Sequence, residues 1–314
     1  MCGLSIFATV ANNKIKTYDT KAFTGSFMPG YDLQGMFMNT YTRFLVVPVE
    51  EMYKHVHHAI PPSRSITHIL IYLTDGEAFM KIGSDTYTIS KGEMLIVPAG
   101  QVFSFEDYSD SIYNKGFICV FHEDIFVGKL FKSKVIKDFE FLQVWGNPKI
   151  ELGETNEVVS AILSHLSAEF QQQGLGRMDI IQSQFMALLC EINAVYKPLS
   201  VSKQTAAVGL SNKFKELLSK HTYTHHMVSD YAMLLNVSPN HLNKTVKSIT
   251  GKSPTKWIDE ALVLEAKVLL YQTDLSISQV ANDVGIADQS YFSRLFKKYE
   301  GITPVQFRKK IEMS

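Results

Sequence analysis

The 314-residue sequence has few cysteines and no long hydrophobic run. Its three cysteines, Cys2, Cys119 and Cys190, lack the spacing of a metal site, and so sparse a number fits a reducing compartment. No run of about 18 apolar residues is present, so no membrane-spanning helix is expected. The first residues lack the basic region and cleavage motif of a secretory signal. These absences predict a cytoplasmic protein.

The sequence also lacks an excess of charge of either sign, because 31 basic side chains balance 31 acidic ones. A uniformly basic coat protein for nucleic acid is therefore excluded. The balance hides an asymmetry: residues 211–314 carry 14 basic and 10 acidic side chains, and residues 1–210 carry 17 and 21. A modestly basic C-terminal third points weakly to a polyanionic partner. With 46% apolar residues, the chain can bury the cores of two or three domains.

The N-terminal half has the pattern of short apolar runs separated by turn residues that is typical of β-structure. Short runs rich in Ile, Val, Tyr and Phe occur at residues 44–47, 69–73, 79–82, 94–97 and 117–121. Turn residues separate them, as in Thr74-Asp75-Gly76 and Pro98-Ala99-Gly100. Strands that recur about every 8–12 residues with such turns predict a sandwich or a barrel.

Helical periodicity replaces this pattern after residue 155. Apolar residues recur at three- and four-residue steps over 156–172 and again over 178–196, which predicts a helix hairpin. We expect one of the two helices to present its apolar stripe to a twin chain, since symmetric dimers are the commonest oligomers. Packing of the stripe on the chain's own β-domain is the alternative. Residues 198–211 are small and polar, which predicts a linker before a helical region over 212–314.

An internal repeat within the helical region is the most informative feature of the sequence. Residues 232–237 match residues 281–286 at an offset of 49, and beyond the turn the offset becomes 50. At that second offset Leu242 matches Phe292, Lys244 matches Arg294, and Pro254 matches Pro304. An ordinary helical bundle explains one such copy, but two copies in register favour a shared, specialised structure.

Each copy has the physical features of a helix-turn-helix. A small residue, Ala232 or Ala281, lies where a second helix must cross closely. Asn236 or Gly285 follows four residues later, and these residue types best tolerate the positive φ of a sharp turn. Ser238 or Asp288 can then cap the second helix.

The second helix of each copy is expected to bury Leu242 and Val246, or Phe292 and Phe296, and to expose polar and cationic side chains. Between the copies, Ser253 and Pro254 predict the start of a helix that ends near residue 271 and is about 25 Å long. Side chains on the exposed faces can reach base edges and phosphates. The candidate DNA contacts are Asn240, Asn243, Lys244, Lys247, Gln289, Ser290, Ser293, Arg294, Lys297 and Lys298.

Residues 228–311 resemble the DNA-binding domain of AraC/XylS-type transcription regulators. The resemblance is carried by the stretch from Leu275 to Arg308 and by the first copy from Val237 to Lys244, with Thr245 replacing a more usual apolar residue. It implies two helix-turn-helix subdomains joined by one long helix, and binding to double-stranded promoter DNA. RNA polymerase is left open as a further partner.

The N-terminal half resembles the cupin-like sensor domain that is often fused to such a domain, on the strength of Asp75-Gly76 and residues 91–100. The resemblance implies an α+β multidomain protein. Residues 1–197 would form a cupin-like β-barrel with a helix hairpin for sensing or dimerisation, and the protein would be a homodimer. Arg64 and His68 are weak candidates for binding a small effector. The alternative is a barrel that binds no small ligand and serves only as a dimerisation or protein-contact module.

A cupin metalloenzyme with a DNA-binding tail is a remote third possibility. The pair His55 and His57 could share a metal ion, with His58 beside it. The acidic residue expected shortly after the pair is missing, and Phe103 occupies the place of the second motif's histidine. We therefore predict no enzyme activity, no metal and no cofactor. His225 and His226, before the first repeat, are interpreted as solvated side chains.

Overall fold

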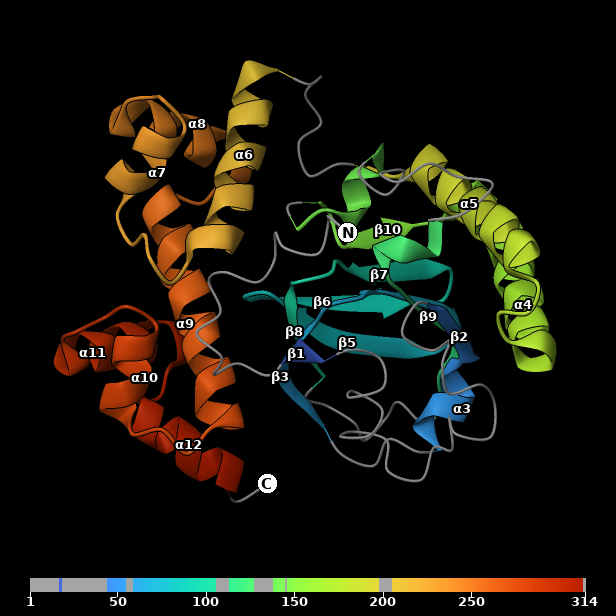
Figure 1. Cartoon of the computed structure of the whole chain (residues 1–314), viewed down its shortest axis with the longest axis horizontal. Helices are drawn as coiled ribbons and strands as arrows, with labels where there is room; N and C mark the ends of the chain where they lie inside the picture. The colour runs from blue at the N-terminus through green and yellow to red at the C-terminus, as the bar shows by residue number, and fades with distance from the viewer. Residues whose placement is uncertain are drawn as a thin grey trace, which may run out of the picture.

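A computed structural model of the chain describes residues 17–18, 44–54, 59–105, 113–126, 138–144, 146–197 and 205–312. Two β-sheets and a helix hairpin form the N-terminal half, and a bundle of helices forms the C-terminal half. The two halves have separate hydrophobic cores, one among residues 44–192 and the other among residues 214–296. Helix α9 (Pro254–Gln272) runs along the junction between them (Figure 1).

The β-domain consists of two five-stranded sheets. The first has the order β1-β3-β8-β5-β6, and the second has the order β10-β7-β4-β9-β2. Pairing is antiparallel except between β1 and β3. The strands are β1 (Thr17–Tyr18), β2 (Phe44–Pro48), β3 (Ile60–Ser65), β4 (His68–Asp75), β5 (Glu77–Ile82), β6 (Asp85–Ser90), β7 (Glu93–Val97), β8 (Val102–Phe105), β9 (Lys115–Phe121) and β10 (Lys149–Glu151).

The predicted apolar runs lie within these strands, and the predicted turns lie between them. Gly76 adopts a φ of +91° at the β4–β5 turn, where a side chain at residue 76 would collide with Asn114. The two sheets face each other around a common core that includes Phe103 and Phe105. Among the described strands no ladder joins one sheet to the other, so the domain is a two-sheet, sandwich-like structure, and closure into the cupin-like barrel that the resemblance implies is not seen. Sequence spacing cannot distinguish the two, because closure depends on pairing between distant edges.

The helix hairpin covers the second sheet. It consists of α4 (Asn156–Gln173) and α5 (Met178–Val195), and α4 packs on β2. Phe185 of α5 contacts Phe44 edge-to-face, with ring centroids 5.1 Å apart. The apolar stripes of both helices are buried in the chain's own core, and Val158 is the large apolar side chain of the hairpin that stays exposed. The expectation that a stripe faces a twin chain is therefore wrong, because the sheet itself needs that cover.

Shorter elements complete the N-terminal half. They are α3 (Val49–Tyr53) and three 3₁₀ turns, η2 (Glu123–Phe126), η4 (Glu140–Leu142) and η5 (Gly153–Thr155). Residues of the turn η4 line a cavity together with residues of the C-terminal helices. In the part of the chain that the structure describes, no helix is long and apolar enough to cross a membrane.

The C-terminal half is entirely helical. Helix α6 begins at Ala206, inside the segment that we assigned to the linker, and the Thr205 hydroxyl caps it by accepting a hydrogen bond from the Val208 amide at 3.3 Å. Sequence periodicity missed this first turn because its residues are small. The helices are α6 (Ala206–His221), α7 (Val228–Leu234), α8 (Pro239–Thr250), α9, α10 (Ile277–Asp283), α11 (Gln289–Glu300) and α12 (Pro304–Glu312).

Candidate nucleic-acid interface

Helices α7 and α8 form the first helix-turn-helix. The turn between them is made by Asn236 at a φ of +53°, the one described non-glycine residue with a positive φ. The Ser238 hydroxyl caps α8 by accepting a hydrogen bond from the His241 amide at 3.2 Å. Ala232 is buried where the two helices cross. The roles predicted for these residues in the turn, the cap and the helix crossing are confirmed.

Helices α10 and α11 repeat the arrangement with different residues. Gly285 makes the turn at a φ of +85°, and the Asp288 carboxylate caps α11 by accepting hydrogen bonds from the amides of Ser290 and Tyr291 at 2.8 and 3.1 Å. Both recognition helices, α8 and α11, end at a glycine in the left-handed conformation. Their equal lengths follow from equivalent caps at both ends.

Both recognition helices are amphipathic in the way the sequence predicts. Leu242 and Val246 on α8, and Phe292 and Phe296 on α11, are fully buried. The opposite face of each helix is polar and accessible. All of the candidate DNA contacts lie on these faces, with Asn243 and Ser293 half-buried and the others exposed: Asn240, Lys244 and Lys247 on α8, and Gln289, Ser290, Arg294, Lys297 and Lys298 on α11.

The cationic side chains on these faces differ in whether they have an ion-pair partner. Lys298 lies 3.7 Å from an Asp259 carboxylate oxygen and 4.9 Å from the centre of the Tyr299 ring. Lys244, Lys247, Arg294 and Lys297 have no ion-pair partner among the described residues. Four unpaired cations on the exposed faces of α8 and α11 leave positive charge available for a phosphate backbone.

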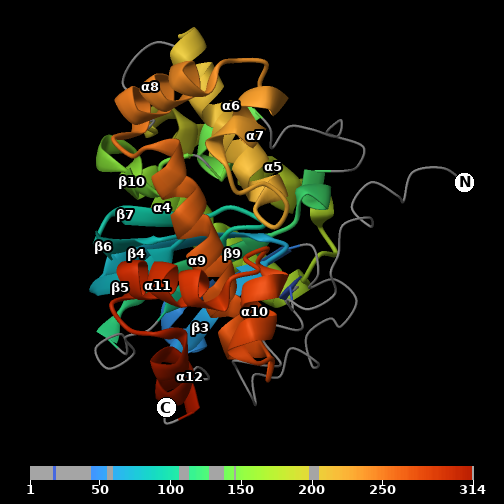
Figure 2. The same ribbon diagram turned by 90° about the vertical axis from the view of Figure 1, so that its left-hand side faces the viewer.

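Helix α9 holds the two recognition helices apart. Its 19 residues give a length of about 28 Å, close to the ~34 Å of one duplex turn. Lys267 of α9 forms an ion pair of 2.9 Å with Glu300 of α11, and the Tyr299 hydroxyl donates a hydrogen bond of 2.9 Å to Asp259 of α9. Helices α8 and α11 lie on the side of α9 away from the β-sheets, as the two perpendicular views agree (Figures 1 and 2). The β-domain therefore leaves the recognition faces uncovered.

The two subdomains also touch each other directly. The ring of His226, in the segment before α7, lies against Gly285 in the turn of the second subdomain. Its Nε2 is buried without a hydrogen-bond partner. The interpretation of His226 as a solvated residue is wrong, because the α6–α7 connection folds back onto α10 and α11. Nothing in the local sequence signals this contact, which joins residues 59 positions apart.

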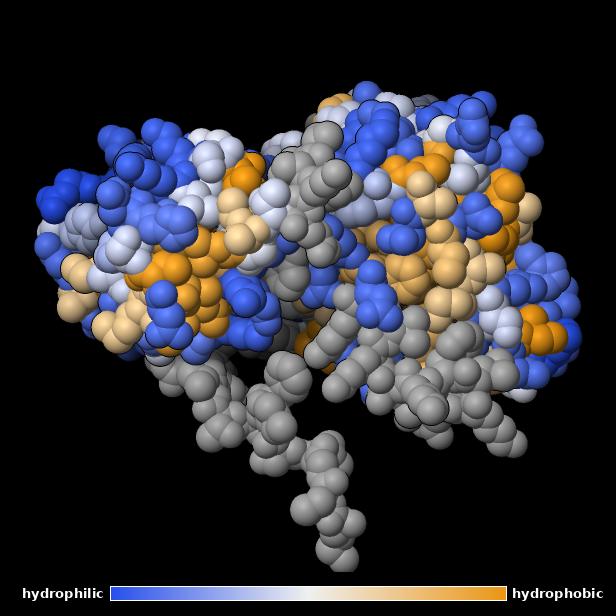
Figure 3. Space-filling view, turned by 90° about the horizontal axis from the view of Figure 1, so that it is seen from above, coloured by the Kyte–Doolittle hydropathy of each residue, from blue (hydrophilic) through white to orange (hydrophobic). Residues whose placement is uncertain are grey.

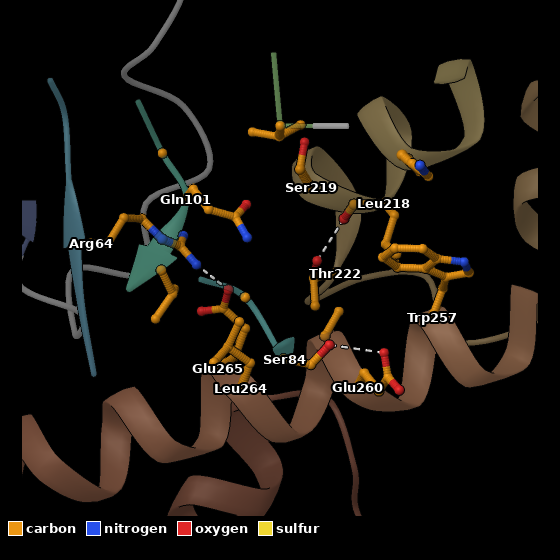
Figure 4. A pocket seen from close by; sticks show the side chains of 16 residues that line it. Arg64, Ser84, Gln101, Leu218, Ser219, Thr222, Trp257, Glu260, Leu264 and Glu265 are labelled. Atoms are coloured by element: carbon orange, nitrogen blue, oxygen red, sulfur yellow. Dashed lines mark hydrogen bonds and ion pairs between the residues drawn. The ribbon is translucent and has the colours of Figure 1, made fainter. Parts of the chain in front are cut away.

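Arg64, a candidate effector ligand, instead joins the two halves of the molecule. Its guanidinium forms an ion pair with Glu265 of α9 (Figure 4). The Tyr223 hydroxyl donates a hydrogen bond to the same carboxylate. Burial lowers the pKa of the Arg64 guanidinium, but the charges and hydrogen bonds of Glu265 and Tyr223 together outweigh burial, so the net effect is a rise. The Arg64 side chain is thus used in a contact between the two halves, and the residues near it in the sequence do not indicate that contact.

A second group of ionic contacts lies beside the first. The Lys252 ammonium lies 3.0 Å from Asp85 on β6 and 3.1 Å from Glu260 on α9. The Ser84 hydroxyl donates a hydrogen bond of 2.9 Å to Glu260 (Figure 4). Together with Arg64, Tyr223 and Glu265, these residues form what we call the α9 junction. A cleft lined by Trp257 and Gln101 runs through it.

His68, the other candidate effector ligand, does not line this cleft. It is buried in the β-domain, stacked on Phe121 with ring centroids 5.0 Å apart. Its Nδ1 accepts a hydrogen bond of 3.1 Å from the Ala99 amide, and its Nε2 has no partner. Burial lowers the pKa of His68 to about 3, so the ring is neutral at physiological pH. The structure does not bring His68 and Arg64 to one site.

The remote metal hypothesis depends on histidines 55, 57 and 58, which lie outside the described residues. Of the acidic residues before them, Glu51 forms an ion pair of 2.6 Å with Lys54, and Glu50 accepts a hydrogen bond of 3.4 Å from the Gly116 amide. No group of three potential metal ligands occurs among the described residues. Phe103 is buried in the sandwich core. Phe105 belongs to the same core, and the partly buried Phe117 packs against it.

Comparison with known proteins identifies the helical half. A helix-turn-helix domain family matches residues 231–310. The uncharacterized HTH-type transcriptional regulator YisR of Bacillus subtilis is 30% identical over 92 residues, which are 29% of this chain and 32% of YisR. The MmsAB operon regulatory protein of Pseudomonas aeruginosa is 25% identical over 259 residues, covering 81% and 79% of the two chains.

Among solved structures, ToxT from Vibrio cholerae is similar over 85% of this chain and 98% of its own, with a TM-score of 0.45 and 16% identity. The chain thus spans about a third of the length of YisR and most of the MmsAB regulator. The family match at residues 231–310 covers both helix-turn-helix units, whose caps, turns and exposed faces are described above. The helical half is thus a double helix-turn-helix domain of the matched family, and it is similar to the DNA-binding domain of AraC/XylS-type transcription regulators.

Proposed function

We propose that this chain is a sequence-specific DNA-binding transcription regulator whose two recognition helices enter successive segments of one major groove. The observation that carries the proposal is the placement of α8 and α11 on one side of α9, each exposing polar and cationic side chains (Figure 2). A helix in the major groove reads bases from its N-terminal half, while flanking cations contact phosphates. Family membership supports the same function.

We further propose that residues 1–197 act as a regulatory domain and that the boundary lies in the segment before α6. Two separate hydrophobic cores support the division. The α9 junction supports a regulatory role, because it connects the β-domain to the helix that spaces the recognition helices. The ion pair between Arg64 and Glu265 favours a second candidate role, that of a protein-contact module without a small ligand.

Arg294 is expected to read a base. Its guanidinium is exposed in α11 and can form two parallel hydrogen bonds with guanine O6 and N7, a fork that the equivalent Lys244 cannot form. Arg294→Ala should therefore cost about 1–3 kcal/mol of binding free energy and relax the preference at one base pair. Selection of binding sites from random duplexes, by the wild type and the variant, measures both effects.

The matched control is Lys310→Ala, which removes an exposed cation from α12 of the same subdomain. It should leave the selected sequence unchanged. If Arg294→Ala lowers affinity equally on all sites and alters no position of the selected sequence, Arg294 clamps a phosphate and reads no base. Failure of the wild type to select any sequence would overturn the proposed function itself.

Self-association is a separate part of the proposal. Viewed from above, hydrophobic surface gathers in patches on each half of the molecule (Figure 3). Val158 on α4, 46% exposed, is the large apolar side chain on the outside of the hairpin. We expect a homodimer at tens of micromolar that Val158→Asp weakens, because a charge buried in an interface is costly. Sedimentation that shows only monomer, with and without DNA, would contradict this expectation.

A further inference from the structure

A cavity of about 250 Å³ lies between the two halves of the molecule, next to the α9 junction. Residues of β6 and η4 line it from the β-domain, and residues of α6, α8 and α9 line it from the helical domain. Trp257 and Tyr87 give it aromatic walls, and Gln101, Gln143 and Asn212 add amide groups. Pockets for drug-sized ligands measure about 300–1,000 Å³, so this cavity suits a smaller molecule.

Lys215 of α6 is the unusual member of the lining. Its side chain is only 9% exposed, yet no carboxylate lies within ion-pair distance of its ammonium among the described residues. Its ammonium lies over the ring of Trp257, whose centre is 5.1 Å from Nζ. Burial lowers the pKa of Lys215 to about 8, which still leaves most of the ammonium protonated at neutral pH. A buried cation without a counter-ion is costly unless something pairs with it.

Glu140 of η4 contributes the opposite charge from the β-domain. It lines the same cavity, is half-buried, and has no ion-pair partner among the described residues. Burial raises its pKa, and the charge of Lys215 acts against that rise. The two groups thus influence each other across the cavity without forming a direct ion pair.

The other charges on the cavity wall are already neutralised. Lys252 pairs with Asp85 at 3.0 Å and with Glu260 at 3.1 Å. Lys215 and Glu140 are therefore the two unpaired charges of opposite sign, and each comes from a different half of the molecule. A guest that carries one charge would leave the other unpaired, whereas a guest with both charges satisfies the two at once.

We propose that this cavity binds a small zwitterion, an α-amino acid, with its carboxylate on Lys215 and its ammonium on Glu140. The amide groups and the wall of Trp257 are left for the side chain of the guest. Because its two anchors come from different halves, the bound amino acid fastens η4 to α6. Its role as the regulator's effector rests on the proposed function, but the binding itself does not.

The test is calorimetric titration of the full chain, without DNA, with each of the common L-amino acids at up to 10 mM, roughly tenfold above a millimolar Kd. For each amino acid that binds, its des-amino acid and its decarboxylated amine serve as single-charge probes. We expect at least one amino acid to bind and both single-charge probes to bind about 10-fold or more weakly, the range of a lost charged hydrogen bond. Absence of binding by every amino acid would overturn the proposal, as would equal binding of either single-charge probe.

Two variants locate the site. Lys215→Met and Glu140→Gln keep the shape of each side chain and should each weaken amino-acid binding about 10-fold or more. The matched controls are Lys213→Met on the exposed face of α6 and Glu154→Gln on η5, which should bind as the wild type does. Unchanged binding by the first pair would overturn the assignment to this cavity. If no amino acid binds but the wild type still selects DNA sites, the binding proposal fails while the proposed function stands.

Discussion

DNA binding by the full chain should weaken by about 10²- to 10⁴-fold between 50 and 200 mM salt, if each molecule neutralises about four to eight phosphates. The four unpaired cations on α8 and α11, together with Lys298, set the lower part of that range. Each neutralised phosphate contributes about −0.9 to the slope of log affinity against log salt, because counterions are released from the duplex. Fluorescence anisotropy with a labelled duplex at several salt concentrations measures the slope.

Single variants sharpen this prediction. Lys247→Gln should reduce the magnitude of the slope by about one, since it removes one phosphate contact. Lys197→Gln is the control, because Lys197 is 80% exposed in the β-domain and pairs only weakly with Glu151 at 3.7 Å. A flat salt dependence of the wild type, or equal slopes for Lys247→Gln and the wild type, would show that α8 does not approach the phosphate backbone as described.

Gly285→Ala should destabilise the helical domain by about 3 kcal/mol or more. The φ of +85° is strained for alanine, at a cost of about 1–3 kcal/mol. The added Cβ would also collide with Cε1 of His226 and would lie 2.9 Å from the Tyr223 carbonyl oxygen. Overpacking of this kind adds about 1–3 kcal/mol. Urea denaturation followed by circular dichroism at a helix-sensitive wavelength measures the loss.

Gly301→Ala is the matched control for strain alone. Gly301 has a similar φ of +76°, but no atom lies within 4 Å of the position of an added Cβ. We expect Gly301→Ala to cost about 1 kcal/mol, the lower end of the strain range. Adding His226→Ala to Gly285→Ala should recover part of the loss, since it removes the ring from the collision. Equal costs for the two glycine variants would mean that His226 does not pack against the turn.

The helix-turn-helix pair could be predicted almost completely because its determinants are local. A cap such as Ser238 acts on an amide three residues away, and the turn residues Asn236 and Gly285 act on their own φ angles. The buried positions of α8 and α11 follow from helical periodicity within one helix. Because the two copies recur at a nearly constant offset, an assignment made in one copy can be checked against the other.

The features that escaped prediction depend on residues far apart in the sequence. Arg64 and Glu265 are 201 positions apart, and neither carries a local signal of its partner. The same holds for Lys215 and Glu140, whose relation is set by how the two halves meet. Local patterning predicted the strands but left open whether they close into a barrel, because the order of strands in each sheet is a long-range property.

The position of Glu265 on α9 has a thermodynamic consequence. Lys267, two residues further along the same helix, holds the second recognition helix through Glu300, so one rigid helix carries both the attachment to the β-domain and the spacing of the DNA contacts. If DNA binding depends on how firmly the β-domain holds α9, as we propose, any molecule that changes this hold changes DNA affinity by some factor. By linkage, DNA must change the affinity for that molecule by the same factor. Measuring effector affinity with and without a bound duplex therefore gives the strength of regulation without a single transcription assay.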